Sequence, residues 1–257
     1  GDEGPGRMTE PNEIIDHIAR HCSQEIPQNL EGVNVMVTAG PTRERLDPVR
    51  YITNDSSGKQ GLAIANAAKS KGATVTLIAG PNVEPTNPEI FRIDVESAIE
   101  MNNAVQEHLK ETDLFIGVAA VADYRPANSL KEKIKRHGNK SLTNLELTEN
   151  PDVIANVAKV NNRPIIVGFA AETNNPLKHA REKRIRKGID AIIVNDVSDP
   201  SIGFNSTENA ATLIHEGGEI AFAKQSKISL GAELIDQLEN IFSLSKRQKS
   251  LRQTSHA

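Results

Sequence analysis

Residues 35–61 read VMVTAGPTRERLDPVRYITNDSSGKQG and predict the first strand and first helix of an α/β fold. Val35 to Thr38 predict a buried strand that turns at Ala39-Gly40-Pro41. A polar segment leads to Ser56-Ser57-Gly58, where a helical run from Lys59 to Lys71 begins. The first N–H groups of a helix have no partner within it, and the helix dipole favours an anion there. The start of this helix is therefore a candidate phosphate site.

Strand and helix patterns alternate through most of the remaining chain. A nearly continuous apolar run, DLFIGVAAVA at 113–122, is typical of a central parallel strand covered on both faces. A two-strand hairpin is predicted around Gly217-Gly218. The sequence thus predicts an α/β fold with a Rossmann-like, mostly parallel sheet, helices on both faces and a small antiparallel extension. Further strands are expected at 73–79, 90–95, 164–171 and 189–194, and helices at 11–20, 97–109, 150–160, 176–187 and 226–244.

Composition excludes several classes of protein. The 257 residues carry a formal net charge of −4, and without a basic excess duplex nucleic acid is not expected as a partner. The one cysteine, Cys22, cannot form an internal disulfide, and no Cys/His cluster suggests structural zinc. No apolar run approaches ~20 residues and no signal-peptide core is visible, so we expect no membrane span and a cytoplasmic location.

Two common phosphate signatures do not fit the candidate helix start. A P-loop requires Gly-Lys followed by Ser or Thr, whereas Gly58-Lys59 is followed by Gln60. A dinucleotide fingerprint has its glycines directly after the strand, but nearly twenty residues separate Gly40 from Gly58. From this feature alone, an anion site and an ordinary helix start with a glycine packed near a strand are equally consistent with the sequence.

Small or polar residues follow three further predicted strands. Asp123 follows the run of small residues at 119–122, and lysines follow in the loop at 131–136. Phe169 lies in GFAAET at 168–173, ahead of the basic run 183–187, and Asn195-Asp196 ends another strand. Ligands of open α/β sheets bind beyond the carboxyl ends of strands. Each feature alone also fits a solvated loop or a core aromatic, but together they indicate a nucleotide cleft.

The sequence shows no nucleophile–base pair. The histidines are scattered, and no serine lies in a GxSxG elbow. The chemistry indicated is therefore positioning and charge neutralisation of a triphosphate, as in phosphoryl and nucleotidyl transfer.

Seven motifs occur in one order: VTAGPTRERLDPVRYITNDSSGKQG, AAVADYRP, EKIK, NPD, GFAAET, KRIRK and NDVS. In this order they resemble bacterial phosphopantothenoylcysteine synthetase, the ligase half of a bifunctional coenzyme A biosynthesis protein, over residues 33–244. The resemblance implies joining of 4′-phosphopantothenate to cysteine with CTP and Mg²⁺, through an acyl-cytidylate. Residues 4–11 look like the tail of the FMN-dependent decarboxylase half, so an excised C-terminal portion is expected.

The resemblance also implies roles for particular residues. Asn54 would act on the acyl-cytidylate and its conversion to product, and Arg50 lies in the same segment. Lys133 of EKIK would be needed for formation of the acyl-cytidylate. Ser57 and Gly58 remain anion candidates from helix-terminus physics. The Mg²⁺ ligand stays unassigned. The implied CTP-binding residues are Gly117, Val118, Ala119, Asp123, Lys133, Thr148, Glu149, Asn150, Pro151, Phe169, Lys183 and Lys187.

We expect three segments: 1–32 as linker and short helix from a preceding decarboxylase domain, 33–244 as the ligase domain, and 245–257 as a disordered tail. The family's dimerisation region fits the antiparallel extension, so a homodimer is implied, with part of the Asn54 segment completing a site across the interface. Two alternatives stay open. An NAD-dependent oxidoreductase lacks its glycine fingerprint here, and a nucleotide-binding module without activity is disfavoured by the presence of Arg50, Asn54 and Lys133.

Overall fold

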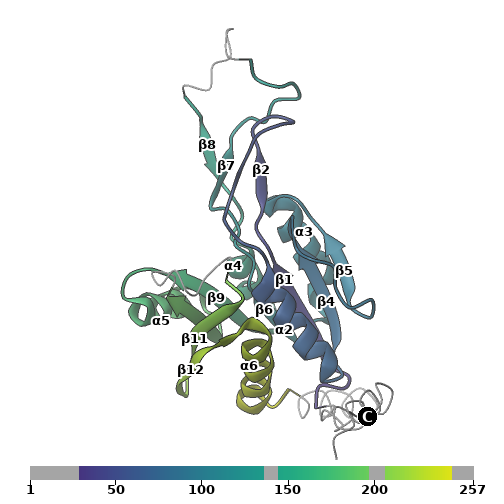
Figure 1. Ribbon diagram of the computed structural model, residues 1–257, viewed down its shortest axis with the longest axis vertical. Coiled ribbons are helices and arrows are strands. Elements are labelled where there is room, and N and C mark those ends of the chain that lie inside the picture. The colour runs from purple at the N-terminus through teal and green to yellow at the C-terminus, as the bar shows by residue number, and fades with distance from the viewer. Residues whose placement is uncertain (1–28, 136–143, 197–205, 245–257) are drawn as a thin grey trace, which may run out of the picture.

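The computed structural model describes residues 29–135, 144–196 and 206–244, which form an eight-stranded sheet covered by helices and two small sheets (Figure 1). The predicted helix at 11–20 and the predicted tail at 245–257 lie outside the described residues. In chain order the elements are β1 (Asn34–Ala39), β2 (Arg43–Arg45), β3 (Tyr51–Thr53), α2 (Lys59–Ser70), β4 (Thr74–Ala79), β5 (Phe91–Asp94), α3 (Ala98–His108), the 3₁₀ turn η1 (Leu109–Glu111), β6 (Leu114–Gly117), β7 (Tyr124–Pro126), β8 (Leu147–Glu149), α4 (Val153–Ala158), β9 (Ile165–Glu172), α5 (Pro176–Lys187), β10 (Ala191–Asp196), β11 (Glu208–His215), β12 (Gly218–Ser226) and α6 (Lys227–Phe242).

The main sheet confirms the predicted fold class. Its order is β12-β11-β10-β9-β6-β1-β4-β5, and every pairing from β5 to β10 is parallel. The hairpin β11–β12 continues this sheet antiparallel beyond β10, as the turn at Gly217-Gly218 predicts. No helix among the described residues is long and apolar enough to cross a bilayer.

Each central strand contributes to two cores. Val35 and Val37 of β1 pack with α2 and α6 on one face, and Met36 packs with α3, α4 and α5 on the other. In β6, Ile116 packs on the face covered by α2 and α6, and Phe115 packs on the opposite face. Strands buried on both faces need apolar residues at successive positions, which explains the apolar runs of the sequence.

The order in which the chain adds strands to the sheet reverses between β1 and β6, which are neighbours. From β1 it proceeds to β4 and β5 on one side, then returns to β6, β9 and β10 on the other. The loops that leave β1 and β6 stay together, because the Ala120 N–H donates to the Gly40 carbonyl at 2.9 Å and Pro41 bridges Ala120. Crevices at such a switch point are where open α/β sheets bind ligands.

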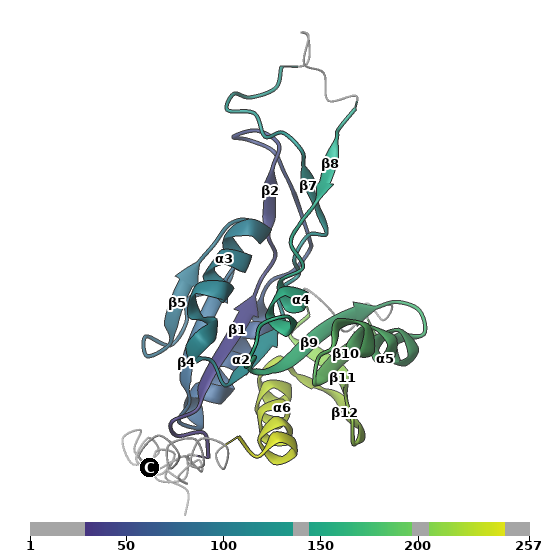
Figure 2. The ribbon, with the colours of Figure 1, turned by 180° about the vertical axis from the view of Figure 1, so that it is seen from behind.

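The same two loops then form an arm that the sequence does not predict. We call "the arm" the antiparallel pairs β2–β3 and β7–β8 with the described loops that join them. Figures 1 and 2 show β2, β7 and β8 projecting together from one end of the molecule. Strands of three residues are too short for an alternation pattern, so the sequence predicts no strands in these segments.

Two boundaries differ from the prediction. β6 ends at Gly117, because the rest of the apolar run follows the Gly40 loop. Helix α4 begins at Val153 with Asp152 as its N-cap, whose carboxylate accepts the Ala155 N–H at 3.0 Å. Asn150, the first residue of the predicted helix at 150–160, lies before α4, and its side-chain amide donates to the Ala122 carbonyl at 2.8 Å.

The contact between α2 and α6 yields a stability prediction. A Cβ added at Gly231 of α6 would lie 2.9 Å from the Ala63 carbonyl carbon and 3.1 Å from the Ile64 nitrogen. Since backbone cannot yield like a flexible side chain, we expect Gly231→Ala to lower the free energy of unfolding by about 1–3 kcal/mol. Urea denaturation measures it, with the exposed Asn240→Ala of the same helix as a control expected to change it by less than about 0.5 kcal/mol. Equal stability of the two variants would contradict this close packing.

Candidate functional site

Two adjoining pockets lie at the carboxyl ends of β1 and β6 and share Ala119 and Phe169. The space between their walls, which is open to solvent, amounts to about 590 Å³ in the first (pocket A) and 710 Å³ in the second (pocket B). Pocket A is lined by Gly40, Ser56, Ser57, Gly58, Lys59, Gln60, Gly61, Val118, Ala119, Ala120, Phe169, Ala171, Asn195, Asn209 and Lys227. Pocket B is lined by Thr38, Gly117, Ala119, Val121, Ala122, Asp123, Asn150, Pro151, Asp152, Val153, Ile154, Phe169, Lys183 and Lys187.

Pocket A is built around the N-terminus of α2. Gly58, the N-cap, has φ +72°, and a Cβ there would lie 2.6 Å from Val83 Cγ2 and 3.1 Å from the Gly40 nitrogen. The packing interpretation of this glycine is therefore confirmed, and the helix start also lines a pocket, so the anion site stays a prediction. As a glycine, this N-cap has no side chain that could cap the helix.

Two lysines add positive charge to pocket A, and none of its lining residues is acidic. Lys227, at the start of α6, is 5% exposed. Burial, with a smaller contribution from Lys59, lowers the Lys227 pKa to about 8. Two cations and a helix N-terminus facing one cavity favour an anionic ligand.

A chain of buried amides forms another wall of pocket A. The Asn209 amide donates to Gln60 Oε1 and the Asn195 amide donates to Asn209 Oδ1, each at 3.2 Å. Asn195 Oδ1 is buried and has no hydrogen-bond partner among the described residues. A buried acceptor without a partner is unfavourable, so a ligand N–H or O–H at this position would be stabilising.

Pocket B combines lysines with carboxylates. Lys187 of α5 contacts the Asp152 carboxylate at 2.9 and 3.0 Å. Burial raises the Asp152 pKa, but the Ala155 N–H and Lys187 offset it, and the net pKa is lowered. The Lys183 pKa is also lowered, first by burial and then by repulsion from Lys187, against the attraction of Glu172 and Asp123. Crowded, partly desolvated lysines are typical of phosphate sites.

The segment before α4 is held against the Asp123 loop. The Asn150 N–H donates to the Asp123 carbonyl at 2.8 Å, and Arg125 contacts the Glu149 carbonyl and Asn150 Oδ1. Asn150 and Pro151 therefore line pocket B, as predicted. Thr148 and Glu149 lie in β8 of the arm and line neither pocket.

The predicted CTP-binding residues do not all face one pocket. Val118 lines pocket A, Gly117 lines pocket B, and Ala119, the residue after Val118, lines both. Phe169 packs against the core and lines both pockets. The remaining pocket B residues expected from the sequence, Asp123, Lys183 and Lys187, are brought together as predicted.

The three predicted catalytic residues lie at the arm and its base. The Asn54 amide donates to the carbonyl of Ala120, a pocket A residue, at 2.9 Å. Arg50 and Lys133 line neither pocket. They lie close together in the arm, since Arg50 donates to the carbonyl of Ile134, the residue after Lys133, at 3.3 Å.

Sequence reasoning missed several lining residues. The Asn-Pro-Asp before an apolar run could have identified Asp152 as the N-cap. Asn209 and Lys227 carry no local signal, because they meet Gln60 across 149 and 167 residues. Only the folded sheet brings them to the start of α2.

Comparison with known proteins places the chain in a family. Residues 30–242 match the model of the "DNA/pantothenate metabolism flavoprotein C-terminal domain". The chain belongs to this family. The match covers nearly all the described residues, including those of the two pockets and the arm.

Its relatives include longer, bifunctional proteins. The chain is 50% identical over 242 residues to the coenzyme A biosynthesis bifunctional protein CoaBC of Escherichia coli K12, and 47% identical over 236 residues to that of Vibrio cholerae. These alignments cover 93% and 91% of this chain but 59% and 58% of the relatives, so the chain spans about three fifths of their length.

A solved structure confirms the fold. The crystal structure of the C-terminal domain of a CoaBC protein superposes with a TM-score of 0.71 at 33% identity, covering 84% of this chain and 98% of that one. The overall fold described above is therefore shared with a solved structure of the same family.

Proposed function

We propose that the chain is a CTP-dependent phosphopantothenate–cysteine ligase acting in coenzyme A biosynthesis. The observation that carries the proposal is the pair of adjoining cationic pockets at the switch point, which share Ala119 and Phe169. A reaction that joins a phosphorylated acid to a nucleotide needs two anion sites with the reacting atoms between them. The chain's identity to proteins named for coenzyme A biosynthesis supports this assignment.

In this proposal pocket A takes 4′-phosphopantothenate. The helix start at Ser57-Gly58 and the lysines Lys59 and Lys227 would bind the phosphate. The partnerless Asn195 Oδ1 suits a donor such as the amide N–H or a hydroxyl of the pantothenate part. Its carboxylate would then lie toward the residues shared with pocket B.

Pocket B takes CTP in this proposal. Lys183 and Lys187 would bind phosphate oxygens, Asp123 suits the ribose hydroxyls, and Phe169 offers a ring face. Among the described residues no group of three or more His, Cys, Asp or Glu could hold a metal. Mg²⁺ would therefore enter on the triphosphate, with Asp123 able to add a single ligand, and would supply charge neutralisation there.

The chemistry proceeds in two displacements. The phosphopantothenate carboxylate attacks the α-phosphorus of CTP, an O–P bond forms, and pyrophosphate leaves. The amine of cysteine then attacks the acyl carbon, an amide forms with loss of a proton, and CMP leaves. Lys133 would neutralise charge at the reacting phosphate in the first step, and Asn54 would orient the acyl-cytidylate in the second.

The alternatives differ in what they need from the site. An NAD-dependent oxidoreductase needs glycines directly after β1, whereas α2 begins nearly twenty residues after Gly40. A binding module without activity would have the same pockets but no turnover, so kinetics separates it from the ligase. A cytoplasmic location, and fusion to an FMN-dependent decarboxylase in the complete protein, belong to the same proposal.

Turnover tests the proposal directly. With CTP, Mg²⁺, 4′-phosphopantothenate and cysteine we expect release of pyrophosphate and CMP in equal amounts, and calorimetry should show CTP binding more tightly than ATP. Lys133→Gln should reduce pyrophosphate release by at least about a hundredfold, since a cation at the reacting phosphate is lost. The matched control is Lys135→Gln, an exposed lysine two residues further on. CTP binding without any release would favour the binding module.

Lysine substitutions separate the two pockets. Lys227→Met should raise the KM for phosphopantothenate about tenfold and leave that for CTP unchanged, and Lys183→Met should do the reverse. Because the Lys227 pKa is near 8, its ammonium is present below that pH and lost above it. Wild-type kcat/KM for phosphopantothenate should thus fall as pH rises through about 8, and Lys227→Met should flatten this fall. Equal effects on both substrates would contradict the division.

We also propose that the chain forms a homodimer through the arm. Sequence reasoning favours the β11–β12 hairpin, but the arm carries five exposed large apolar side chains: Val49, Tyr51, Tyr124, Leu145 and Leu147, from 40 to 55% exposed. Contiguous exposed apolar side chains favour association. Since Arg50 and Lys133 line neither pocket of their own chain, a dimer would let them serve the partner's site.

Mixing of two impaired variants tests the shared site. Lys133→Gln and Lys183→Met subunits, assayed at CTP well below its KM, should regain activity when mixed, because a mixed dimer holds one site with an intact pocket and an intact partner lysine. Mixtures no more active than the separate variants would show that the lysine acts within its own chain.

Light scattering should give twice the 27.9 kDa chain mass, and Leu147→Asp should give the monomer mass. Ile185→Asp, equally apolar and 73% exposed on α5, should stay dimeric.

A further inference from the structure

Asp47 places a carboxylate inside the arm. Its side chain is 0% exposed, and a buried carboxylate is strongly unfavourable unless charges and hydrogen bonds compensate it. Here each of its oxygens accepts two hydrogen bonds. The two oxygens serve different parts of the chain, and this division indicates what the residue does.

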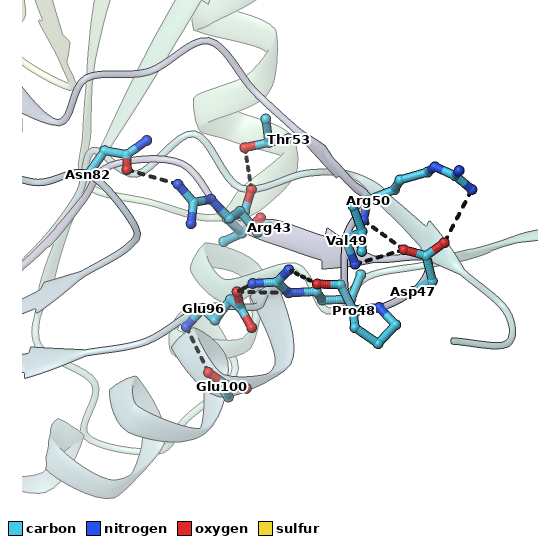
Figure 3. Close-up of polar contacts among 11 residues, drawn as sticks. Arg43, Asp47, Pro48, Val49, Arg50, Thr53, Asn82, Glu96 and Glu100 are labelled. Atoms are coloured by element: carbon cyan, nitrogen blue, oxygen red, sulfur yellow. Dashed lines mark hydrogen bonds and ion pairs between the residues drawn. The ribbon is translucent and has the colours of Figure 1, made fainter. Parts of the chain in front are cut away.

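Oδ1 closes a local turn. It accepts the N–H groups of Val49 and Arg50, each at 2.8 Å, as an aspartate commonly does for the residues two and three further along (Figure 3). This half of the carboxylate shapes the loop between β2 and β3.

Oδ2 makes a contact between segments that are distant in sequence. It accepts the Ile134 N–H at 3.1 Å and a guanidinium N–H of Arg50 at 3.3 Å. The same Arg50 nitrogen donates to the Ile134 carbonyl at 3.3 Å, so Asp47 and Arg50 together hold both backbone groups of Ile134. The Leu130 N–H also donates to the Leu46 carbonyl at 2.9 Å. Lys133 thus lies between two anchored residues while its own side chain stays exposed.

We propose that Asp47 is a positioning residue that fixes Arg50 and the backbone of Lys133 in one arrangement, so that both cations meet the reacting phosphate together. The inference rests on the proposed function for its catalytic consequence. The carboxylate is ionised, as the role requires: burial raises the Asp47 pKa, but the N–H groups of Ile134, Val49 and Arg50 and the Arg50 charge offset it, and the net pKa is lowered.

Asp47→Asn separates the two halves of this carboxylate. An asparagine can present its carbonyl oxygen to the turn, but its amide then faces the Ile134 N–H and the Arg50 guanidinium, donor against donor. We expect kcat for pyrophosphate release to fall about tenfold to a hundredfold, with the KM for CTP changed less than about twofold. Asp47→Ser, which keeps one acceptor for the turn, should give the same result if the asparagine variant folds poorly.

Glu96→Gln is the matched control. Glu96 pairs with Arg45 of the same hairpin, and among the described residues its side chain has no hydrogen bond or ion pair with the 130–134 segment. The Glu96→Gln variant should retain the wild-type kcat for pyrophosphate release. A loss equal to that of Asp47→Asn would mean that any loosening of the hairpin suffices, and would overturn the proposal.

Hydrogen exchange supplies a readout that does not depend on turnover. The Ile134 N–H should exchange faster in Asp47→Asn than in the wild type. In Glu96→Gln its exchange rate should equal that of the wild type. Unchanged Ile134 exchange in Asp47→Asn, or wild-type kcat in that variant, would overturn the proposal. If the wild type itself releases no pyrophosphate, the proposed function fails, and the exchange of Ile134 alone decides whether Asp47 holds this segment.

Discussion

The close approach of the loops that leave β1 and β6 determines where the rest of the site lies. Ala120 bonds to Gly40, and Gly40 has φ +83° with so little room that a Cβ would lie 2.5 Å from Val83 Cγ2. Gly58 packs against Gly40 under the same limit, which sets the start of α2 beside the end of β1. Two backbone segments and a helix N-terminus therefore converge where the sheet order reverses, and both pockets form around them.

Charge is distributed unequally around this point. Pocket A has lysines without any lining carboxylate, whereas in pocket B Asp152 partly neutralises Lys187. A bound phosphate would offset the desolvation of Lys227 and the repulsion between Lys183 and Lys187. In the proposed function, the lowered pKa values of Lys227 and Lys183 are thus the cost of holding cations ready for anions.

Local signals predicted what local physics determines. Helix α5 runs from Pro176 to Lys187 as expected, because proline at the first position and Gly188 after the end, at φ +63°, act on adjacent residues. The hairpin at Gly217-Gly218 was found for the same reason. The meeting of Gln60, Asn209 and Lys227 could not be found, since it depends on β11 and α6 packing beside α2. Nor could the arm, whose strands are stabilised by contacts between its two halves rather than by their own three-residue patterns.

The arm shows how residues remote from the sheet can still be placed accurately. A lysine side chain has high rotamer freedom, and an exposed loop adds the freedom of its backbone. Asp47 restricts only the backbone freedom: it holds the peptide groups beside Lys133 and leaves the ammonium in solvent. The buried carboxylate pairs with Arg50 but orders only the backbone beside Lys133, so in the proposed function it does not neutralise that ammonium. A direct Asp–Lys133 ion pair would hold the side chain equally well but would cancel the charge that the phosphate needs.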